Sequence, residues 1–364
     1  MNLFTFIDKY GDYNFDEFEF NEVDNVVMSM LSYLDLTRIV SNNKFNKKRI
    51  QDVGDIFFSN YDKEKKNIRA IKNAIKILKY IKDTKRYKDL LLYNYVYETS
   101  GDSQFGVLTI ELNKNLVYVS FEGTDHLIGG WKEDFMLSYS FPVLSQKRAI
   151  NYVNKNFWLS RKKIILGGHS KGGNLALVAG MYANFLVRKK IIKIYNNDGP
   201  GLLTPQYEST YFKNIESKLI SIVPNYSIVG ILMRHGDLTV VRSFRKSALS
   251  HDPLSWVVND NNFEKTNLSS FSNVLDSEID NWLKNYSIDE RKKLVYALFN
   301  IFDTLAIDSL IDLISDKKLV IKILKEAGKF DELTKDMIWS FTKVIIKCFT
   351  DVTKEEIKTI FSKK

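Results

Sequence analysis

The sequence predicts an α/β protein with a mostly parallel central sheet flanked by helices and with an all-helical C-terminal extension. Between about residues 90 and 243, short runs rich in β-branched and aromatic residues alternate with segments of helical spacing. Strands separated by helices are typical of a parallel sheet. One such run, in residues 162–177, meets a serine between glycines and continues as a helix-compatible segment. From about residue 265 onward, strand signals are scarce and helical spacing prevails.

The first 60 residues are expected to form a helical segment that packs on the core. An acidic stretch at 16–25 precedes apolar residues with helical spacing at 26–34. In residues 63–83, isoleucine, leucine and alanine recur every three or four positions, which predicts an amphipathic helix. Two helices are therefore expected before the first strand.

The sheet is expected to begin with antiparallel strands and to continue with parallel ones. Apolar runs predict strands at 90–97, 104–112 and 116–121, and the short polar connection between the last two is typical of a hairpin. A helix around 145–158 then precedes a strand at 163–168 and a helix at about 172–188. The remaining strands are expected at 191–196, 218–223 and 238–243.

The C-terminal part is expected to be helical throughout, with helices at 276–285, 288–303, 307–315, 318–327 and 332–349. Because no repeat or low-complexity linker separates this part from the rest, we expect it to pack against the core. The predicted division is an N-terminal helical segment at 1–60, an α/β core at 61–264 and a helical extension at 265–364.

The composition is that of a soluble globular protein, with 45% hydrophobic and 27% charged residues among 364. The net charge is +9, and the basic residues are spread along the chain without a nucleic-acid-binding motif, so no nucleic acid partner is expected. A solvated surface is the simpler interpretation of this charge, and peripheral contact with an anionic membrane is the functional one. The oligomeric state is left open.

Targeting signals are not found in the sequence. The N-terminus lacks the basic and apolar regions of a signal peptide, and no apolar run is long enough to span a bilayer. The single cysteine, Cys348, excludes an intrachain disulfide. These observations lead us to expect a cytoplasmic protein.

The serine between glycines, Gly168-x-Ser170-x-Gly172, has the spacing of a nucleophile elbow. A serine held in a strained turn at the top of a sheet needs neighbours without Cβ atoms, because the strand and the helix approach closely there. The following helix directs its N-terminal N–H groups toward the same place. A structural glycine turn with an incidental serine is the alternative interpretation.

A nucleophilic serine needs a base and an acid, which follow it in the chain order acid, then histidine. His251, in a loop after the last strand, is the first candidate for the base, and His235 is the second. Asp198, which closes the strand after the elbow helix, is the first candidate for the acid, because catalytic groups gather at the carboxyl ends of strands. Asp237 is the second candidate. We expect His169, beside the serine, to point away and to serve packing.

An oxyanion needs two hydrogen-bond donors. The first is expected to be the backbone N–H of Lys171, the residue after the nucleophile. The second is expected from Thr124, in the loop after an earlier central strand, through its N–H and its hydroxyl. An ordinary turn residue is the alternative interpretation of Thr124. No metal or organic cofactor is expected.

These residues resemble the α/β-hydrolase superfamily, and within it the fungal-type (class three) lipases. The strand end Phe-Arg-Gly-Thr of those enzymes is similar to Phe121-Glu122-Gly123-Thr124, and a Trp/Asp-containing segment after it is similar to residues 130–134. Their elbow Gly-His-Ser-x-Gly-Gly is matched by residues 168–173. The resemblance implies an α/β-hydrolase core.

The chain is similar in more detail to a bacterial lipase-like family of unknown function. The motifs that carry this resemblance are Phe-Asn-Glu-Val-Asp at 20–24, Gly-Thr-Asp at 123–125, Trp-Lys-Glu-Asp at 131–134, the elbow at 168–173, Asp-Gly-Pro-Gly at 198–201 and Ser-His-Asp-Pro at 250–253. The likeness spans roughly residues 15–260. Together with the candidate serine, histidine and aspartate, it leads to the first hypothesis for the function, a carboxylesterase or lipase that acts on a small acyl ester or lipid through an acyl-enzyme.

This sequence departs from the pattern of the fungal-type lipases in the position of the catalytic acid. Fungal-type lipases usually carry it after the strand that corresponds to 218–223, but residues 224–230 contain no carboxylate. The vertebrate-lipase branch places the acid one strand earlier, in a setting similar to Asn197-Asp198-Gly199-Pro200. The departure supports Asp198 and leaves a second hypothesis open: a catalytically weak or inactive hydrolase-fold binding module.

Overall fold

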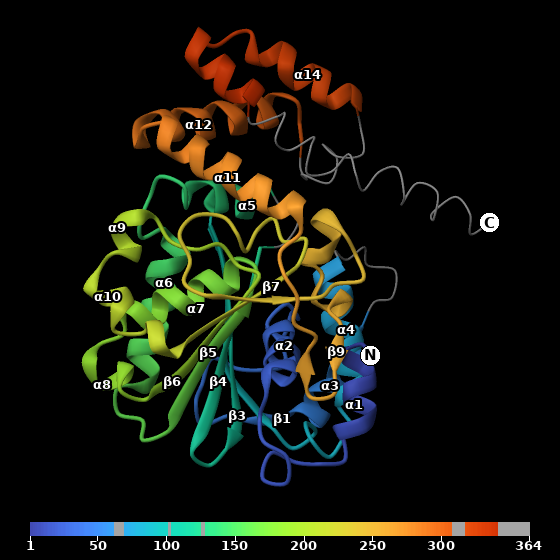
Figure 1. Cartoon of the computed structure of the whole chain (residues 1–364). Helices are drawn as coiled ribbons and strands as arrows, with labels where there is room; N and C mark the ends of the chain where they lie inside the picture. Colours follow the sequence, from blue (N-terminus) through green and yellow to red (C-terminus); the bar gives the residue numbers. More distant parts are fainter. Residues whose placement is uncertain (62–68, 101–102, 125–127, 308–316, 341–364) are drawn as a thin grey trace, which may run out of the picture.

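An eight-stranded sheet runs through the centre of the computed structural model, which describes residues 1–61, 69–100, 103–124, 128–307 and 317–340 (Figure 1). The strands lie in chain order: β1 (Lys48–Arg49), β2 (Leu91–Ser100), β3 (Ser103–Asn113), β4 (Leu116–Phe121), β5 (Lys163–His169), β6 (Ile191–Asn197), β7 (Leu219–Pro224) and β8 (Leu238–Val241). Strands β1 to β4 pair antiparallel, and β4 to β8 pair parallel. The predicted mostly parallel sheet with an antiparallel start is confirmed.

Helices cover both faces of the sheet (Figure 1). One face packs against α1 (Leu3–Tyr10), α2 (Glu22–Leu31), α3 (Ile50–Ser59) and α4 (Arg69–Ile81). The other face packs against α6 (Leu144–Phe157), α7 (Lys171–Tyr182) and α8 (Phe185–Arg188). The expected helix at 172–188 is divided in two, because Asn184 caps the start of α8 with its side chain. Residues 63–68 of the expected helix at 63–83 lie outside the described residues.

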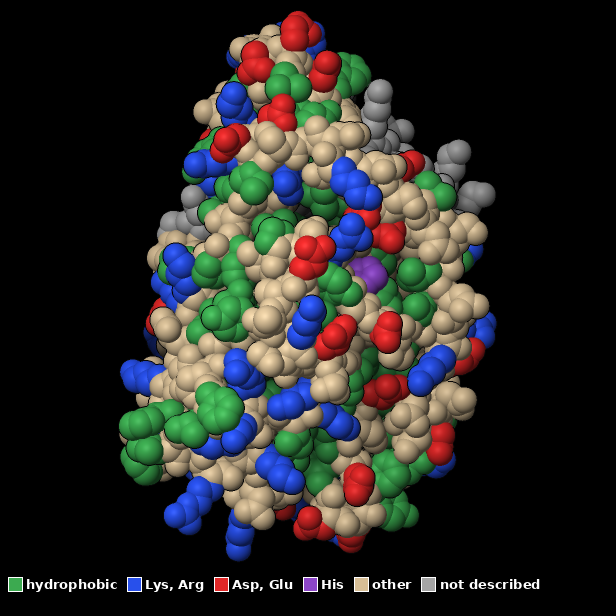
Figure 2. All heavy atoms as spheres, turned by 60° about the vertical axis from the view of Figure 1, so that its left-hand side comes forward, with side chains coloured by type: hydrophobic (Ala, Val, Ile, Leu, Met, Phe, Trp, Pro, Cys, Tyr) green, Lys and Arg blue, Asp and Glu red, His purple; other side chains and the backbone are tan. Residues whose placement is uncertain are grey.

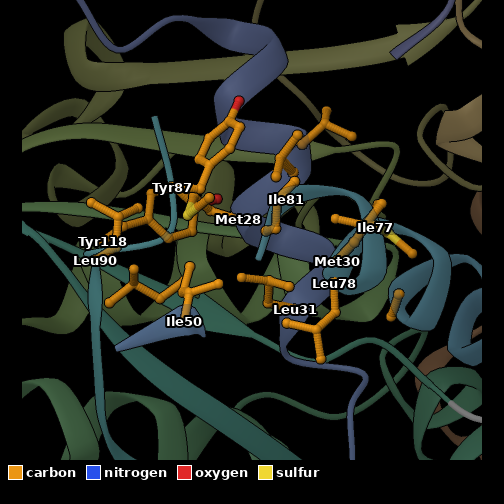
Figure 3. Close-up of a cluster of buried hydrophobic side chains, with 14 of the residues drawn as sticks. Met28, Met30, Leu31, Ile50, Ile77, Leu78, Ile81, Tyr87, Leu90 and Tyr118 are labelled. Atoms are coloured by element: carbon orange, nitrogen blue, oxygen red, sulfur yellow. The ribbon is translucent and has the colours of Figure 1, made fainter. Parts of the chain in front are cut away.

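Side chains of β4 and β5 alternate between the two faces, as the two-residue period of a strand requires. Tyr118 and Ile165 join the apolar cluster under α2 and α4, whereas Val117, Val119 and Leu166 join the cluster under α6 and α7. Figure 3 shows the first of these clusters, with Met28, Met30, Leu31, Ile77, Leu78, Ile81 and Tyr118 among its labelled members.

Short elements follow β6, some between the parallel strands β6 and β7 and the others after β8, the last of them. These are the helices α9 (Thr204–Tyr207) and α10 (Thr210–Lys213), the single-turn helices η1 (Glu216–Lys218), η2 (Ser247–His251) and η3 (Pro253–Ser255), and the two-stranded ribbon of β9 (Val258–Asn259) and β10 (Asn262–Phe263). The loop after the last parallel strand therefore returns toward the sheet as a series of tight turns.

The C-terminal helices form a layer beyond one end of the sheet (Figure 1). They are α11 (Ser270–Asn285), α12 (Ile288–Thr304), α14 (Lys317–Ala327) and a helical run at 332–340. Trp131 and Phe135 of α5 (Ile128–Met136) pack against their apolar cluster, so this layer contacts the core. The helix predicted at 307–315, the end of the one at 332–349 and Cys348 lie outside the described residues, except for Ile307. Among the described helices, none is both long and apolar enough to cross a bilayer.

The N-terminal segment is held to the core by a buried ion pair between Asp24 of α2 and Arg86. Both side chains are fully buried, and the guanidinium donates to both carboxylate oxygens, with Nε 2.8 Å from Oδ1 and Nη2 2.5 Å from Oδ2. The Tyr87 hydroxyl also donates to Oδ1, at 2.6 Å. The remaining guanidinium protons bind the backbone carbonyls of Tyr13, Phe18 and Glu19.

We expect Arg86→Met to lower the free energy of unfolding by about 3–5 kcal/mol, because it leaves the Asp24 carboxylate buried without a counterion. The matched control is Arg49→Met, which breaks an exposed pair with Asp52 and should cost less than about 1 kcal/mol. Urea denaturation followed by circular dichroism measures both values. Similar losses in the two variants would contradict the expectation.

Candidate active site

Ser170 lies in the turn between β5 and α7 in a backbone conformation that non-glycine residues rarely adopt, with φ of 60° and ψ of −134°. The neighbouring chain segments approach so closely that a Cβ on Gly172 would lie 2.1 Å from the Phe121 carbonyl oxygen. A Cβ on Gly168 would lie 2.3 Å from the backbone of Gly172. A parallel sheet whose central strand ends in such a serine turn before a helix is an α/β-hydrolase fold.

Asp198 follows β6, next to β5, and its carboxylate is completely buried. Three donors surround it. Oδ1 accepts from the Ser227 hydroxyl at 2.5 Å and from the Gly230 N–H at 3.1 Å, and Oδ2 lies 2.7 Å from Nδ1 of His251. The residue also has a positive φ, of 50°. The position of this carboxylate therefore costs free energy in two ways, through the strained backbone of Asp198 and through the burial of its charge.

His251 ends the turn η2 and is half-buried. Because the Asp198 carboxylate accepts at Nδ1, the hydrogen bond assigns the proton to Nδ1 and leaves Nε2 unprotonated in the neutral ring. Neither Nε2 nor the Ser170 hydroxyl makes a hydrogen bond with a described residue. The His251 ring nevertheless lies against that of His169, the residue before Ser170, with 4.5 Å between ring centroids.

The alternative candidates lie in other surroundings. Nδ1 of His235 binds the backbone oxygen of the adjacent Gly236, at 3.0 Å. Asp237 is exposed and has no hydrogen bond or ion pair with a described residue. The carboxylate that binds His251 is thus Asp198. The next residue, Asp252, accepts from the side chain of Asn73 in α4, at 2.7 Å, and so ties the histidine loop to that helix.

The two expected oxyanion donors flank the serine turn. Lys171 is the first residue of α7, where a backbone N–H has no partner within the helix. Thr124 follows β4, and its hydroxyl donates to Oδ2 of Asp134 at 2.6 Å. In this structure the proton of the Thr124 hydroxyl is engaged with Asp134. The backbone N–H is the group that remains as a candidate.

The side chain of Lys171 is an unexpected part of the site. It is only 2% exposed, and its ammonium lies 3.3 Å from Glu133, which is equally buried, and 3.8 Å from Asp134. It also donates to the backbone oxygen of Gln104 at 3.2 Å. The other Glu133 oxygen accepts from Ser103 and from the N–H of Ser145. The lysine directly after Ser170 and the Glu-Asp pair at 133–134 are the sequence signals from which this ion pair could have been predicted.

The buried side chain of His169 is hydrogen-bonded to the backbone of the His251 loop. Its Nε2 lies 2.8 Å from the His251 carbonyl oxygen, which can only accept, so Nε2 donates. Its Nδ1 lies 3.0 Å from the Tyr33 hydroxyl and accepts from it in this tautomer. Burial keeps the pKa of His169 well below its usual range, with the nearby His251 adding to this effect. The predicted packing role is found together with two hydrogen bonds that sequence reasoning missed.

Comparison with known proteins places the chain in a family. The model of the family described as Mbeg1-like matches residues 81–300, a region that contains Ser170, Asp198 and His251. The chain belongs to the Mbeg1-like family. A solved structure described as "Crystal structure of M37 lipase" is similar over 58% of this chain and 70% of its own, with 15% identity and a TM-score of 0.36, a likeness too low to establish a shared activity. No curated protein matches the chain.

Two surface hollows of this Mbeg1-like protein lie apart from the serine turn. One, of about 580 Å³, is lined by residues that include Asn225, Arg242 and Phe244. The other, of about 610 Å³, lies along α12. Neither is lined by Ser170, Asp198 or His251. Within the described ranges, no group of three or more side chains has the composition and proximity of a metal site.

In this Mbeg1-like protein we expect Lys171→Met to lower the free energy of unfolding by about 3–5 kcal/mol, since Glu133 keeps a buried charge without its counterion. The double variant Lys171→Met/Glu133→Gln removes that charge and should regain a large part of the loss. Urea denaturation of the two variants and the wild type measures the difference. Equal stability of the single and double variants would argue against the buried pair.

The low pKa of His169 predicts a pH dependence of stability. Below about pH 6.5 the unfolded chain binds a proton at this ring while the folded protein does not, so stability falls as the pH falls. The contribution is at most about 1.4 kcal/mol per pH unit. Unfolding of His169→Gln, measured between pH 7 and 5, should therefore show a shallower decline than that of the wild type. Identical slopes would contradict a neutral buried ring.

Proposed function

We propose that the protein is a serine hydrolase that cleaves an acyl ester through an acyl-enzyme, with Ser170 as the nucleophile, His251 as the base and Asp198 as the acid. The observation that supports this most directly is the 2.7 Å hydrogen bond between the buried Asp198 carboxylate and Nδ1 of His251. Asp198 follows the strand beside the one that ends in the strained Ser170. An imidazole oriented in this way is the arrangement that a nucleophilic serine requires.

The proposed reaction follows from the tautomer of His251. With the proton on Nδ1 held by Asp198, the lone pair of Nε2 accepts the proton of the Ser170 hydroxyl as Oγ attacks the ester carbonyl. The buried carboxylate stabilises the resulting imidazolium, which then protonates the leaving alkoxide. Water then attacks the acyl-enzyme by the same steps, which releases the carboxylic acid product and restores the Ser170 hydroxyl. The bond between Ser170 and His251 is expected to form with substrate, as catalytic hydrogen bonds often tighten only in complexes.

Stabilisation of the tetrahedral intermediate is assigned to the backbone N–H groups of Lys171 and Thr124. The N-terminus of α7 adds its dipole at the same place. The hydrogen bond of the Thr124 hydroxyl to Asp134 and the ion pairs of the Lys171 side chain hold both segments in position. Preorganised donors of this kind are worth about 10²–10³ in kcat each.

The substrate is proposed to be a small acyl ester or a lipid, and no metal ion or organic cofactor has a step in the reaction. The division at residues 60 and 264 and the cytoplasmic location stay predictions from the sequence. The second hypothesis, a catalytically weak or inactive binding module, differs in one measurable respect, because it predicts no turnover of esters.

A fluorophosphonate probe tests the nucleophile. We expect wild-type protein to be labelled at Ser170, identified by mass spectrometry, and Ser170→Ala to remain unlabelled. Asp198→Asn should lower kcat for a p-nitrophenyl ester by about 10³–10⁴-fold, because it removes the acceptor that fixes the His251 tautomer. The matched controls Asp237→Asn and His235→Gln should stay within about twofold of the wild type.

Equal labelling of wild type and Ser170→Ala would contradict the assignment of the nucleophile. A loss of turnover in Asp237→Asn that matches the loss in Asp198→Asn would contradict the assignment of the acid. Absence of turnover from the wild type with esters of several chain lengths, together with absence of labelling, would favour the binding module.

A further inference from the structure

Large apolar side chains are exposed together near the amino ends of β5 and β6. They belong to two segments, 158–163 before β5 and 185–193 around α8 and the start of β6. The exposed fractions are 54% for Trp158, 73% for Leu159, 59% for Phe185 and 56% for Leu186. Single exposed apolar residues are normal, whereas several large ones on neighbouring segments are a feature of interaction surfaces.

Hydrogen bonds hold the two segments side by side. The Lys190 ammonium donates to the carbonyl oxygens of Phe157 and Trp158, at 2.9 and 2.8 Å. The N–H of Asn184 donates to the side chain of Asn154 at 2.8 Å, which joins α6 to the start of α8. The exposed apolar groups and their basic neighbours therefore form one surface, which we call the basic–apolar patch (Trp158, Leu159, Arg161, Lys163, Phe185, Leu186, Lys189 and Lys193).

The charges in the patch have one sign. Neither segment contains an aspartate or a glutamate. Arg161, Lys163 and Lys189 are exposed and form no ion pair with a described residue. The Lys189 ammonium lies over the ring of Phe185, 4.2 Å from its centroid. Figure 2 shows a group of hydrophobic side chains at the lower left with Lys and Arg around it, while acidic side chains gather elsewhere on the same face.

We propose that the basic–apolar patch docks the protein peripherally on an anionic membrane surface. Aromatic and leucine side chains insert at the boundary between headgroups and acyl chains, and a Trp is favoured there because its ring is amphipathic. The surrounding Lys and Arg are attracted to anionic headgroups. Because the same patch supplies both apolar insertion and electrostatic attraction, the protein is held more strongly than it would be by either interaction alone.

The position of the patch sets the orientation of the docked protein. It lies at the amino ends of β5 and β6, whereas Ser170 and Asp198 follow the carboxyl ends of the same two strands. In a strand of seven residues that advances about 3.3 Å from one residue to the next, the two ends lie roughly 20 Å apart. In Figure 1, α8 lies at the end of the sheet away from the C-terminal helices. Docking would thus leave Ser170 facing away from the bilayer.

Vesicle sedimentation of the full chain tests the proposal. We expect binding to vesicles of phosphatidylcholine with phosphatidylglycerol to be at least tenfold tighter than to phosphatidylcholine alone, and to weaken as salt is raised. Phe185→Ser/Leu186→Ser and, separately, Arg161→Glu/Lys189→Glu should each weaken binding at least tenfold.

The matched controls lie on other surfaces. Val274→Ser/Ile288→Ser removes two exposed apolar side chains from α11 and α12, and Lys76→Glu/Lys79→Glu reverses two exposed charges on α4. Both should bind vesicles like the wild type. Ser170→Ala should also bind unchanged, and the patch variants should keep wild-type turnover of a soluble ester. Failure of docking and failure of the proposed hydrolase activity are thereby distinguished.

Three results would overturn the proposal. The first is wild-type protein that does not sediment with anionic vesicles at low salt. The second is a loss of binding in the control variants equal to that in the patch variants. The third is a wild-type dimer in sedimentation velocity that Phe185→Ser/Leu186→Ser dissociates without any effect on vesicle binding, which would assign the patch to a second copy of the chain.

Discussion

The strained backbone of Ser170 is the constraint on which the site depends. A residue with this φ and ψ costs about 1–3 kcal/mol and persists only where the surroundings leave no other conformation. Here the surroundings are the end of β4 at Phe121 and the start of α7, both in contact with glycines of the turn. The close approach fixes the order of β4, β5 and α7 in space. It also places the Ser170 side chain beside the N-terminus of α7.

Burial of the Asp198 carboxylate also costs free energy, because the charge loses its contact with water. The segment after β7 offsets this cost by donating hydrogen bonds to the carboxylate. Fungal-type lipases are expected to carry their acid there, whereas this chain has Ser227 and Gly230, which both donate to Asp198. The segment that lacks a carboxylate therefore supplies the donors that a carboxylate one strand away requires. Without such donors, the desolvation free energy of a buried carboxylate would be strongly destabilising.

Helix α5 joins two parts of the molecule. Glu133 and Asp134 bind the Lys171 side chain and, in the case of Asp134, the Thr124 hydroxyl. Trp131 and Phe135 of the same helix pack into the apolar cluster of the C-terminal helices. The C-terminal layer thus contacts the helix whose carboxylates bind both candidate oxyanion residues.

The sequence by itself determined the fold class, the approximate positions of the main strands, the serine turn and the candidates for acid and base, because hydrophobic period and turn chemistry depend on neighbouring residues. The order of the strands in the sheet came from the tertiary structure. Only the tertiary structure decided which aspartate binds His251, since Asp198 and Asp237 both follow Ser170 in the chain. It also revealed the ion pair of Lys171 with Glu133 and the contact of Tyr33 with His169, which join residues far apart in sequence. Burial and pairing of polar groups depend on the packing of the whole chain, so a local sequence pattern does not predict them.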